Sequence, residues 1–276
     1  MDITNRNFYR LLRSGAFGDH QELEPMSKFK WSRVLQLAEA QDVTIYIAHG
    51  IESHRNDPAL EVFAQMEGEL APYAGKPLPD VIATTLAIMK AEPKPSNVFL
   101  RHRLKNIIKK DDASDDTSIE TQQLLRIIIH NVNETLTRGI SLRGIVEMGR
   151  FLRQRGDRVD YVKLEHWLHQ LGFARLASLL GSILIRIFGF TIDEIPFMQK
   201  EEAGATSLAR RSLENNAEDT AEDWHFRMRT NGMVQNNSRV LRRNLGRSVR
   251  YLRYNPFETT SNFMANFARS LAEIEE

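Results

Sequence analysis

The sequence of 276 residues contains no cysteine, which excludes disulfide bonds, thiolate metal ligands and a cysteine nucleophile. It also lacks an excess of either charge, because 37 Lys and Arg residues stand against 36 Asp and Glu residues, for a formal charge of +1. No global field for nucleic acid or acidic lipid follows, although local patches can form. The start, MDITNRNFYRLLRSG, lacks the pattern of a secretory signal. We therefore expect a cytoplasmic protein.

A long uninterrupted apolar run is missing as well. The most apolar stretch, FARLASLLGSILIRIFGF at 173–190, contains Arg175 and Arg186. A membrane-spanning helix needs about 20 mostly apolar residues in succession. The stretch therefore predicts a buried central helix whose two arginines reach outward.

The spacing of apolar residues is helical nearly everywhere. In KFKWSRVLQLAEA, for example, Trp31, Val34, Leu35 and Ala38 recur at intervals of three and four residues. Capping residues such as Ser141 alternate with glycine stops along the chain. This alternation is typical of antiparallel helix hairpins. The sequence predicts an all-α fold, an irregular bundle of about ten helices.

Changes of composition suggest three regions. The acidic segment DDASDDTS at 111–118 is predicted to be a linker, and the stretch 199–237 is polar and rich in asparagine. We expect an N-terminal helical region at 1–110 and central helical hairpins at 117–198. The third region, 199–276, would hold a polar connection, an arginine-rich helix and a terminal helix.

Motifs that carry chemistry are scarce. The sequence has no HExxH pattern, no GxSxG elbow and no phosphate-binding GxxxxGK[ST] loop. His166 and His169 are three residues apart beside Glu165, but a pair without a third ligand favours ordinary surface histidines. A flexible acidic linker would not aim its carboxylates at Mg²⁺. The sequence therefore predicts no catalytic residue and no metal ligand.

One basic stretch is a candidate binding surface. Residues 227–253 contain eight arginines and no acidic residue, with Tyr251 and Tyr254 nearby. A helix over 239–254 could contact nucleic acid or an anionic membrane surface, or could simply be a solvated face. The candidate binding residues on it are Arg242, Arg243, Arg247 and Arg250.

Separated stretches resemble a bacterial family of uncharacterised nucleotidyltransferase-like proteins that accompany surface-polysaccharide biosynthesis. The N-terminal stretches FYRLLRSGAFG and WSRVLQLAEAQDVTIYIAHGIES look like its N-terminal helical region. The hairpin IIIHNVNETLTRGISLRGIVEMGRFL, the segment VDYVKLEHWLHQLGFARLA and the tail LRRNLGRSVRYLRYNPFE are similar to its C-terminal helical region. The resemblance covers about half the chain, and its motifs are helix-packing patterns.

The resemblance implies binding roles for a few residues of the hairpin. The family pattern of His, Gly-Ile-x-Leu-Arg and an acidic residue falls on His130, 139–143 and Glu147. We expect Arg143 and Glu147 to form an i,i+4 ion pair. Gly144 and Gly149 would let two helices approach closely, and His130 would pack or hydrogen-bond near the same corner.

The family also has a nucleotidyltransferase core with an Asp-x-Asp strand that binds Mg²⁺, and the corresponding interval here is too short for it. We expect a non-catalytic accessory protein without cofactor, whose partner is a protein such as a glycan-assembly enzyme or a true nucleotidyltransferase. The oligomeric state stays open. The alternative is a reduced core in residues 53–117 that uses Mg²⁺ and a nucleoside triphosphate (NTP). Its candidate ligands are Asp111, Asp112, Asp115 and Asp116.

Overall fold

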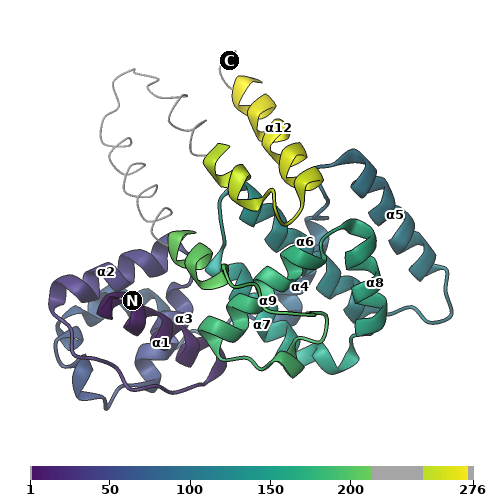
Figure 1. Ribbon diagram of the computed structural model, residues 1–276. Helices are drawn as coiled ribbons and strands as arrows, with labels where there is room; N and C mark the ends of the chain where they lie inside the picture. Colours follow the sequence, from purple (N-terminus) through teal and green to yellow (C-terminus); the bar gives the residue numbers. More distant parts are fainter. Residues whose placement is uncertain (1, 213–244, 273–276) are drawn as a thin grey trace. The chain divides into compact units, whose positions relative to one another are not determined.

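The computed structural model describes residues 2–212 and 245–272. Every regular element in these two ranges is a helix, and none of their residues lies in a strand (Figure 1). The predicted all-α fold is confirmed. The helices form because apolar residues recur every three or four positions, so that each segment buries one face.

The chain divides into two compact units, with the first boundary after Asp80. Among the described residues, 2–80 and 210–212 belong to the first unit, and 81–209 and 245–272 belong to the second. The elements of the first unit are α1 (Ile3–Phe17), α2 (Lys28–Ala40), α3 (Thr44–Ser53) and the short 3₁₀ helices η1 (Pro58–Leu60) and η2 (Phe63–Tyr73).

The first unit is built around a close crossing of α1 and α3. Gly15 of α1 and Gly50 of α3 are both buried. A Cβ atom on Gly15 would lie 1.8 Å from the carbonyl oxygen of Tyr46, and one on Gly50 would lie 2.1 Å from that of Leu11. The two backbones therefore touch directly, and only glycine fits at either position.

The second unit contains most of the helices. Its elements are α4 (Val81–Lys90), α5 (Val98–Asp112), α6 (Ile119–Thr137), α7 (Leu142–Arg155), η3 (Gly156–Arg158), α8 (Tyr161–Leu171), α9 (Ala174–Phe188), η4 (Ile192–Glu194) and α12 (Pro256–Ala272). Residues 205–212 and 245–251 are also helical. The boundary after Asp80 differs from the predicted one at 110, because α4 packs on α6 and α7, and α5 packs on α8.

The α6–α7 hairpin is closed by residues that the sequence identified. The Ser141 hydroxyl accepts the Gly144 N–H at 3.2 Å, and Gly139 has a φ of 105°. The amide of Asn131 donates to the Gly144 carbonyl at 3.1 Å. A Cβ on Gly144 would lie 1.9 Å from the Asn131 side-chain oxygen, which confirms that this glycine permits a close approach.

Helix α9 is the predicted buried helix. Its residues from Leu176 to Leu184 are all buried, while Arg175 and Arg186 reach outward and form ion pairs with Glu202 and Glu201. Across residues 2–212 and 245–272, no helix combines the length and the apolar content that crossing a membrane requires.

Candidate functional site: a groove between helices α5 and α8

A groove of about 670 Å³ lies between α5, the turn that follows it, and α8. A volume in this range suits a small-molecule ligand. The lining combines cationic, amide and aromatic side chains with one ion-pair cluster: Arg103, Asn106, Lys110, Asp111, Asp116, Lys163, His166, Trp167 and Gln170. Because α5 and α8 are rigid, they hold these groups in fixed positions.

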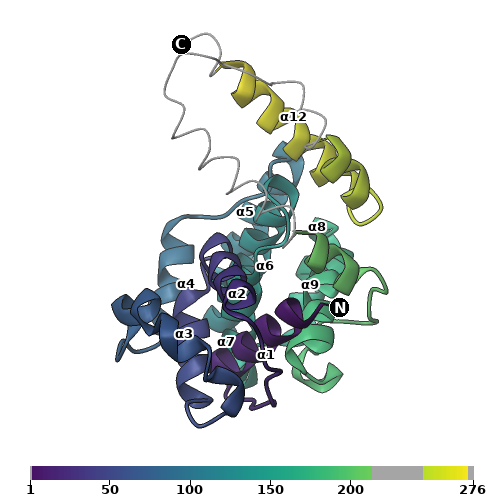
Figure 2. The ribbon, with the colours of Figure 1, turned by 90° about the vertical axis from the view of Figure 1, so that its left-hand side faces the viewer.

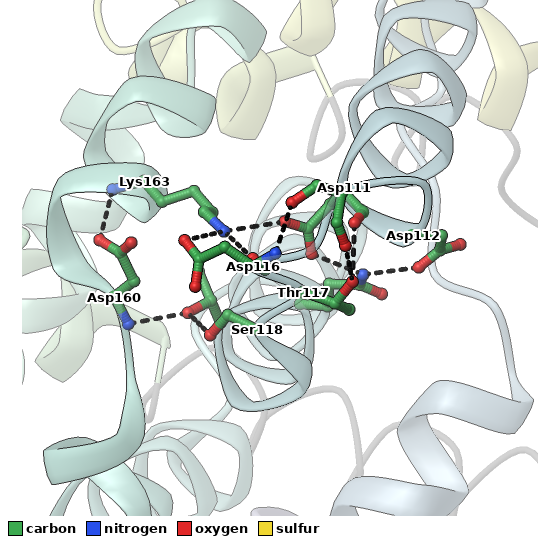
Figure 3. Close-up of polar contacts among 10 residues, drawn as sticks. Asp111, Asp112, Asp116, Thr117, Ser118, Asp160 and Lys163 are labelled. Atoms are coloured by element: carbon green, nitrogen blue, oxygen red, sulfur yellow. Dashed lines mark hydrogen bonds and ion pairs between the residues drawn. The ribbon is translucent and has the colours of Figure 1, made fainter.

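An ion pair between Asp111 and Lys163 belongs to the lining of the groove (Figure 3). Asp111 is 5% exposed and accepts a hydrogen bond from Lys163 Nζ at 3.0 Å. Its second carboxylate oxygen accepts from Gln122 Nε2 at 2.8 Å. Lys163 also donates to the Asp116 carbonyl at 2.5 Å. The prediction of a linker starting at residue 111 is therefore wrong, because Asp111 and Asp112 form the last turn of α5.

The start of α8 positions Lys163 for this contact. Asp160 caps the helix by accepting the Lys163 N–H at 2.9 Å, as its place before the apolar run indicates. The Asp160 N–H in turn donates to the Thr121 hydroxyl of α6 at 2.8 Å. The backbone at Lys163 is thus fixed, and its side chain reaches across to the end of α5 (Figure 3).

The environment of Asp111 favours its charged form. Burial raises the pKa of this carboxyl group, but the hydrogen bonds from Gln122 and Lys163 and the charge of Lys163 lower it more. The net pKa lies below the ordinary value of 3.8. Asp111 is therefore an anion at neutral pH, and Lys163 neutralises it.

Because the pKa of Asp111 is lowered, the wild type should lose stability in acid. The variant Asp111→Asn should not show this loss. A carboxyl group whose folded-state pKa is depressed stabilises the fold above its unfolded pKa, and the stabilisation disappears as the pH falls through the folded value. The wild type should lose its advantage over Asp111→Asn below about pH 4. Urea unfolding of both proteins across this range measures the difference. Asp115→Asn, at an exposed position, is the control, and an equal effect there would contradict the assignment.

The acidic residues of this region do not assemble a metal site. Asp111 and Asp112 share Gln122 Nε2 as a donor, and Asp115 is exposed. In the part of the chain that the structure describes, no three His, Asp or Glu residues are grouped as metal ligands would be. Glu165 and His169 both contact Gln199, at 2.7 and 3.3 Å, and His166 contacts Gln170 at 2.8 Å.

The corner between α6 and α7 holds the other predicted residues. Arg143 and Glu147 form the expected i,i+4 ion pair through Arg143 Nε. His130 is half-buried on α6, and its imidazole has no hydrogen bond with the described residues. The cavity next to Glu147 has a volume of about 10 Å³, which is at most the space of one water molecule. The corner is a packed joint, and binding roles for these three residues stay predictions.

The structure describes only part of the predicted arginine surface, and one arginine of that part is buried. Arg242 and Arg243 lie outside the described residues. Arg247 is 6% exposed and donates from Nη1 to the carbonyl oxygen of Thr137, so it does not present a free guanidinium to a phosphate. Arg250 is half-exposed. Among the described candidates, Arg247 therefore has a structural contact and Arg250 faces solvent in part.

The sequence analysis did not identify the groove. Arg103 and Lys110 lie two turns apart on one helix, and Lys163 is more than 50 residues further along the chain. The only local signal was Trp167 between two histidines on a helix with a strong capping residue. We find no match for this chain among protein-family models, curated proteins or solved structures.

Proposed function

We propose that this chain is a non-catalytic binding protein, a helical relative of the nucleotidyltransferase-like family with an accessory role in surface-polysaccharide assembly. The observation that supports this is the backbone of residues 53–117, which consists of helices, turns and irregular connections and contains no strand. A nucleotidyltransferase needs carboxylates held rigidly on a strand to carry the metal ion and the triphosphate. The reduced-core alternative therefore has no strand to use in that interval.

The α5–α8 groove is the proposed ligand site, and a sugar that carries an anionic group is the ligand class that fits it. Arg103 and Lys110 are exposed cations on its wall, and both pair well with carboxylate or phosphate groups. The amides of Asn106 and Gln170 can hydrogen-bond sugar hydroxyls, and Trp167 supplies an apolar surface. Lys163 already pairs with Asp111 and Asp116, so the lining has three cations against two carboxylates, and its remaining positive charge lies on Arg103 and Lys110.

Titration calorimetry with glucose 1-phosphate and with glucuronic acid tests this proposal, with glucose as the neutral comparison. At least one anionic sugar should bind more tightly than glucose. Lys110→Gln should weaken that binding by about tenfold, because a charge-assisted hydrogen bond contributes roughly 1.5–3 kcal/mol. Lys109→Gln is the matched control, since Lys109 is an exposed lysine on the same helix that does not line the groove.

Three results would overturn the proposal. If none of the sugars binds, or if Lys109→Gln weakens binding as much as Lys110→Gln, the groove is not the site. If ATP with Mg²⁺ raises the melting temperature and the anionic sugars do not, the nucleotidyltransferase alternative replaces the non-catalytic one. A ligand at a hundred times its dissociation constant stabilises a protein by about 2.7 kcal/mol, which a melting curve resolves.

A further inference from the structure

The C-terminal helix α12 has its polar side inward. Glu258 and Thr259 are almost fully buried, and so is Asn262. The Glu258 carboxylate accepts the N–H groups of Ser96 and Asn97 at the start of α5. Asn262 donates to the Thr137 hydroxyl of α6 at 3.2 Å. Polar contacts therefore attach α12 to the second unit, whereas an amphipathic helix usually packs through its apolar face.

Two large apolar side chains of α12 face solvent, while Phe263 and Phe267 are half-buried. Phe257 is 74% exposed and Met264 is 57% exposed. Figure 2 shows the C-terminal half of α12 extending away from α5 and α8. Water-exposed phenylalanine and methionine on a helix of this length mark an interaction surface rather than a folded core.

The preceding helix also has a polar side chain inward and apolar side chains outward. In 245–251, Arg247 is buried, while Leu245 and Val249 are 49% and 59% exposed. Leu245, Val249 and Leu252 recur at intervals of four and three residues, which is the spacing of one helix face, and the structure turns that face outward. We call the exposed residues Leu245, Val249, Leu252, Phe257 and Met264 the C-terminal apolar surface.

Positive charge accompanies this surface. Glu258 is the only acidic residue in 245–268 and is 0% exposed, so every exposed charged side chain in that range is an arginine. Arg250 is half-exposed and Arg253 is exposed. An apolar face flanked by cations is complementary to an anionic lipid surface, which offers hydrocarbon below and negative charge above.

A second copy of the chain is a poorer occupant. Two such surfaces facing one another would bring arginines together, and the described range 245–268 has no exposed carboxylate to pair with them. Separate exposed side chains on a helix can instead insert between lipid chains one by one.

We propose that the C-terminal apolar surface docks on an anionic lipid bilayer, with Phe257 and Met264 inserted at the interface and Arg250 and Arg253 at the lipid headgroups. The contact is peripheral and reversible, because one short helix buries only a few apolar side chains. It is independent of the α5–α8 groove, whose residues it does not use.

Cosedimentation with vesicles tests the proposal. The full chain should bind vesicles that contain phosphatidylglycerol and should bind pure phosphatidylcholine vesicles at least tenfold more weakly, with the difference shrinking as salt rises. The double variant Phe257→Ser with Met264→Ser should bind the anionic vesicles at least tenfold more weakly than the wild type. Arg250→Gln should weaken binding by roughly fivefold, as expected for one cation at the surface.

The controls separate lipid docking from a folding defect. Phe29→Ser removes an equally exposed phenylalanine of α2 and should leave vesicle binding unchanged. All variants should keep the helical circular dichroism of the wild type. The proposal is overturned if the chain ignores anionic vesicles, if Phe29→Ser weakens binding as much as the double variant, or if the double variant abolishes a dimer instead. Sugar binding in the groove should survive the double variant, so either proposal can fail alone.

Discussion

Gly50→Ala should destabilise the N-terminal unit by at least about 3 kcal/mol, as overpacking against rigid backbone does. The added Cβ would lie 2.1 Å from the Leu11 carbonyl oxygen and 2.8 Å from its carbonyl carbon. No side-chain rotation relieves a contact between two backbones, so α1 and α3 would have to separate. Urea unfolding followed by circular dichroism measures the loss.

Gly68→Ala is the matched control for this substitution. It makes the same chemical change in the same unit, but a Cβ there meets nothing within 4 Å. Alanine in a helix is otherwise favoured over glycine by roughly 0.5–1 kcal/mol, so the control should be neutral or slightly stabilising. Equal effects at Gly50 and Gly68 would refute the close crossing. Gly15→Ala should match Gly50→Ala, and the double variant should fall short of their sum because both report one helix contact.

Glu258→Ala should destabilise the second unit by roughly 2–4 kcal/mol, because it leaves two amide groups at the start of α5 without their acceptor. The Ser96 and Asn97 N–H groups both donate to this carboxylate, the latter at 3.0 Å. The negative charge also suits the positive end of the α5 dipole. Thermal unfolding gives the magnitude. Thr260→Ala, at an exposed position of α12, is the control and should change little.

Glu258 should also make the stability of the protein depend on pH, in a direction that follows from its raised pKa. Burial raises the pKa of Glu258 above its ordinary 4.5, while the hydrogen bonds from Ser96 and Asn97 lower it in part. A folded-state pKa above the unfolded one means that the protonated fold is favoured, so this contribution is present at low pH and is lost as the pH rises through the folded value. The stability of the wild type relative to Glu258→Gln should therefore fall as the pH rises above 4.5. A rising difference would show that the pKa is lowered instead.

Local chemistry in the sequence predicted much of the fold. Ser141 caps the helix that it was expected to cap, Asp160 caps α8, and Gly172 has the left-handed conformation of a helix stop, with a φ of 69°. These features depend on neighbours within a few residues, so the local sequence is sufficient to predict them. The pairing of Arg143 with Glu147 follows for the same reason, since one helical turn separates them.

The candidate groove could not be predicted in the same way. Asp111 and Lys163 meet only because α5 packs on α8, and nothing in the segment DDASDDTS distinguishes a helix end from a linker. The orientation of the C-terminal helices was equally hidden. Apolar periodicity identifies a face of 245–252, but whether that face points to the core or to solvent depends on which side chains find partners, here Arg247 with Thr137.

The contact between Glu258 and the start of α5 also bears on how the chain is made. Its carboxylate and the Ser96 amide are 162 residues apart in the sequence. At a synthesis rate of about 5–20 residues per second, the ribosome needs on the order of ten to thirty seconds to produce the second partner after the first. During that interval the beginning of α5 exists without its acceptor. Helix α12, which is synthesised later, therefore completes a helix made much earlier.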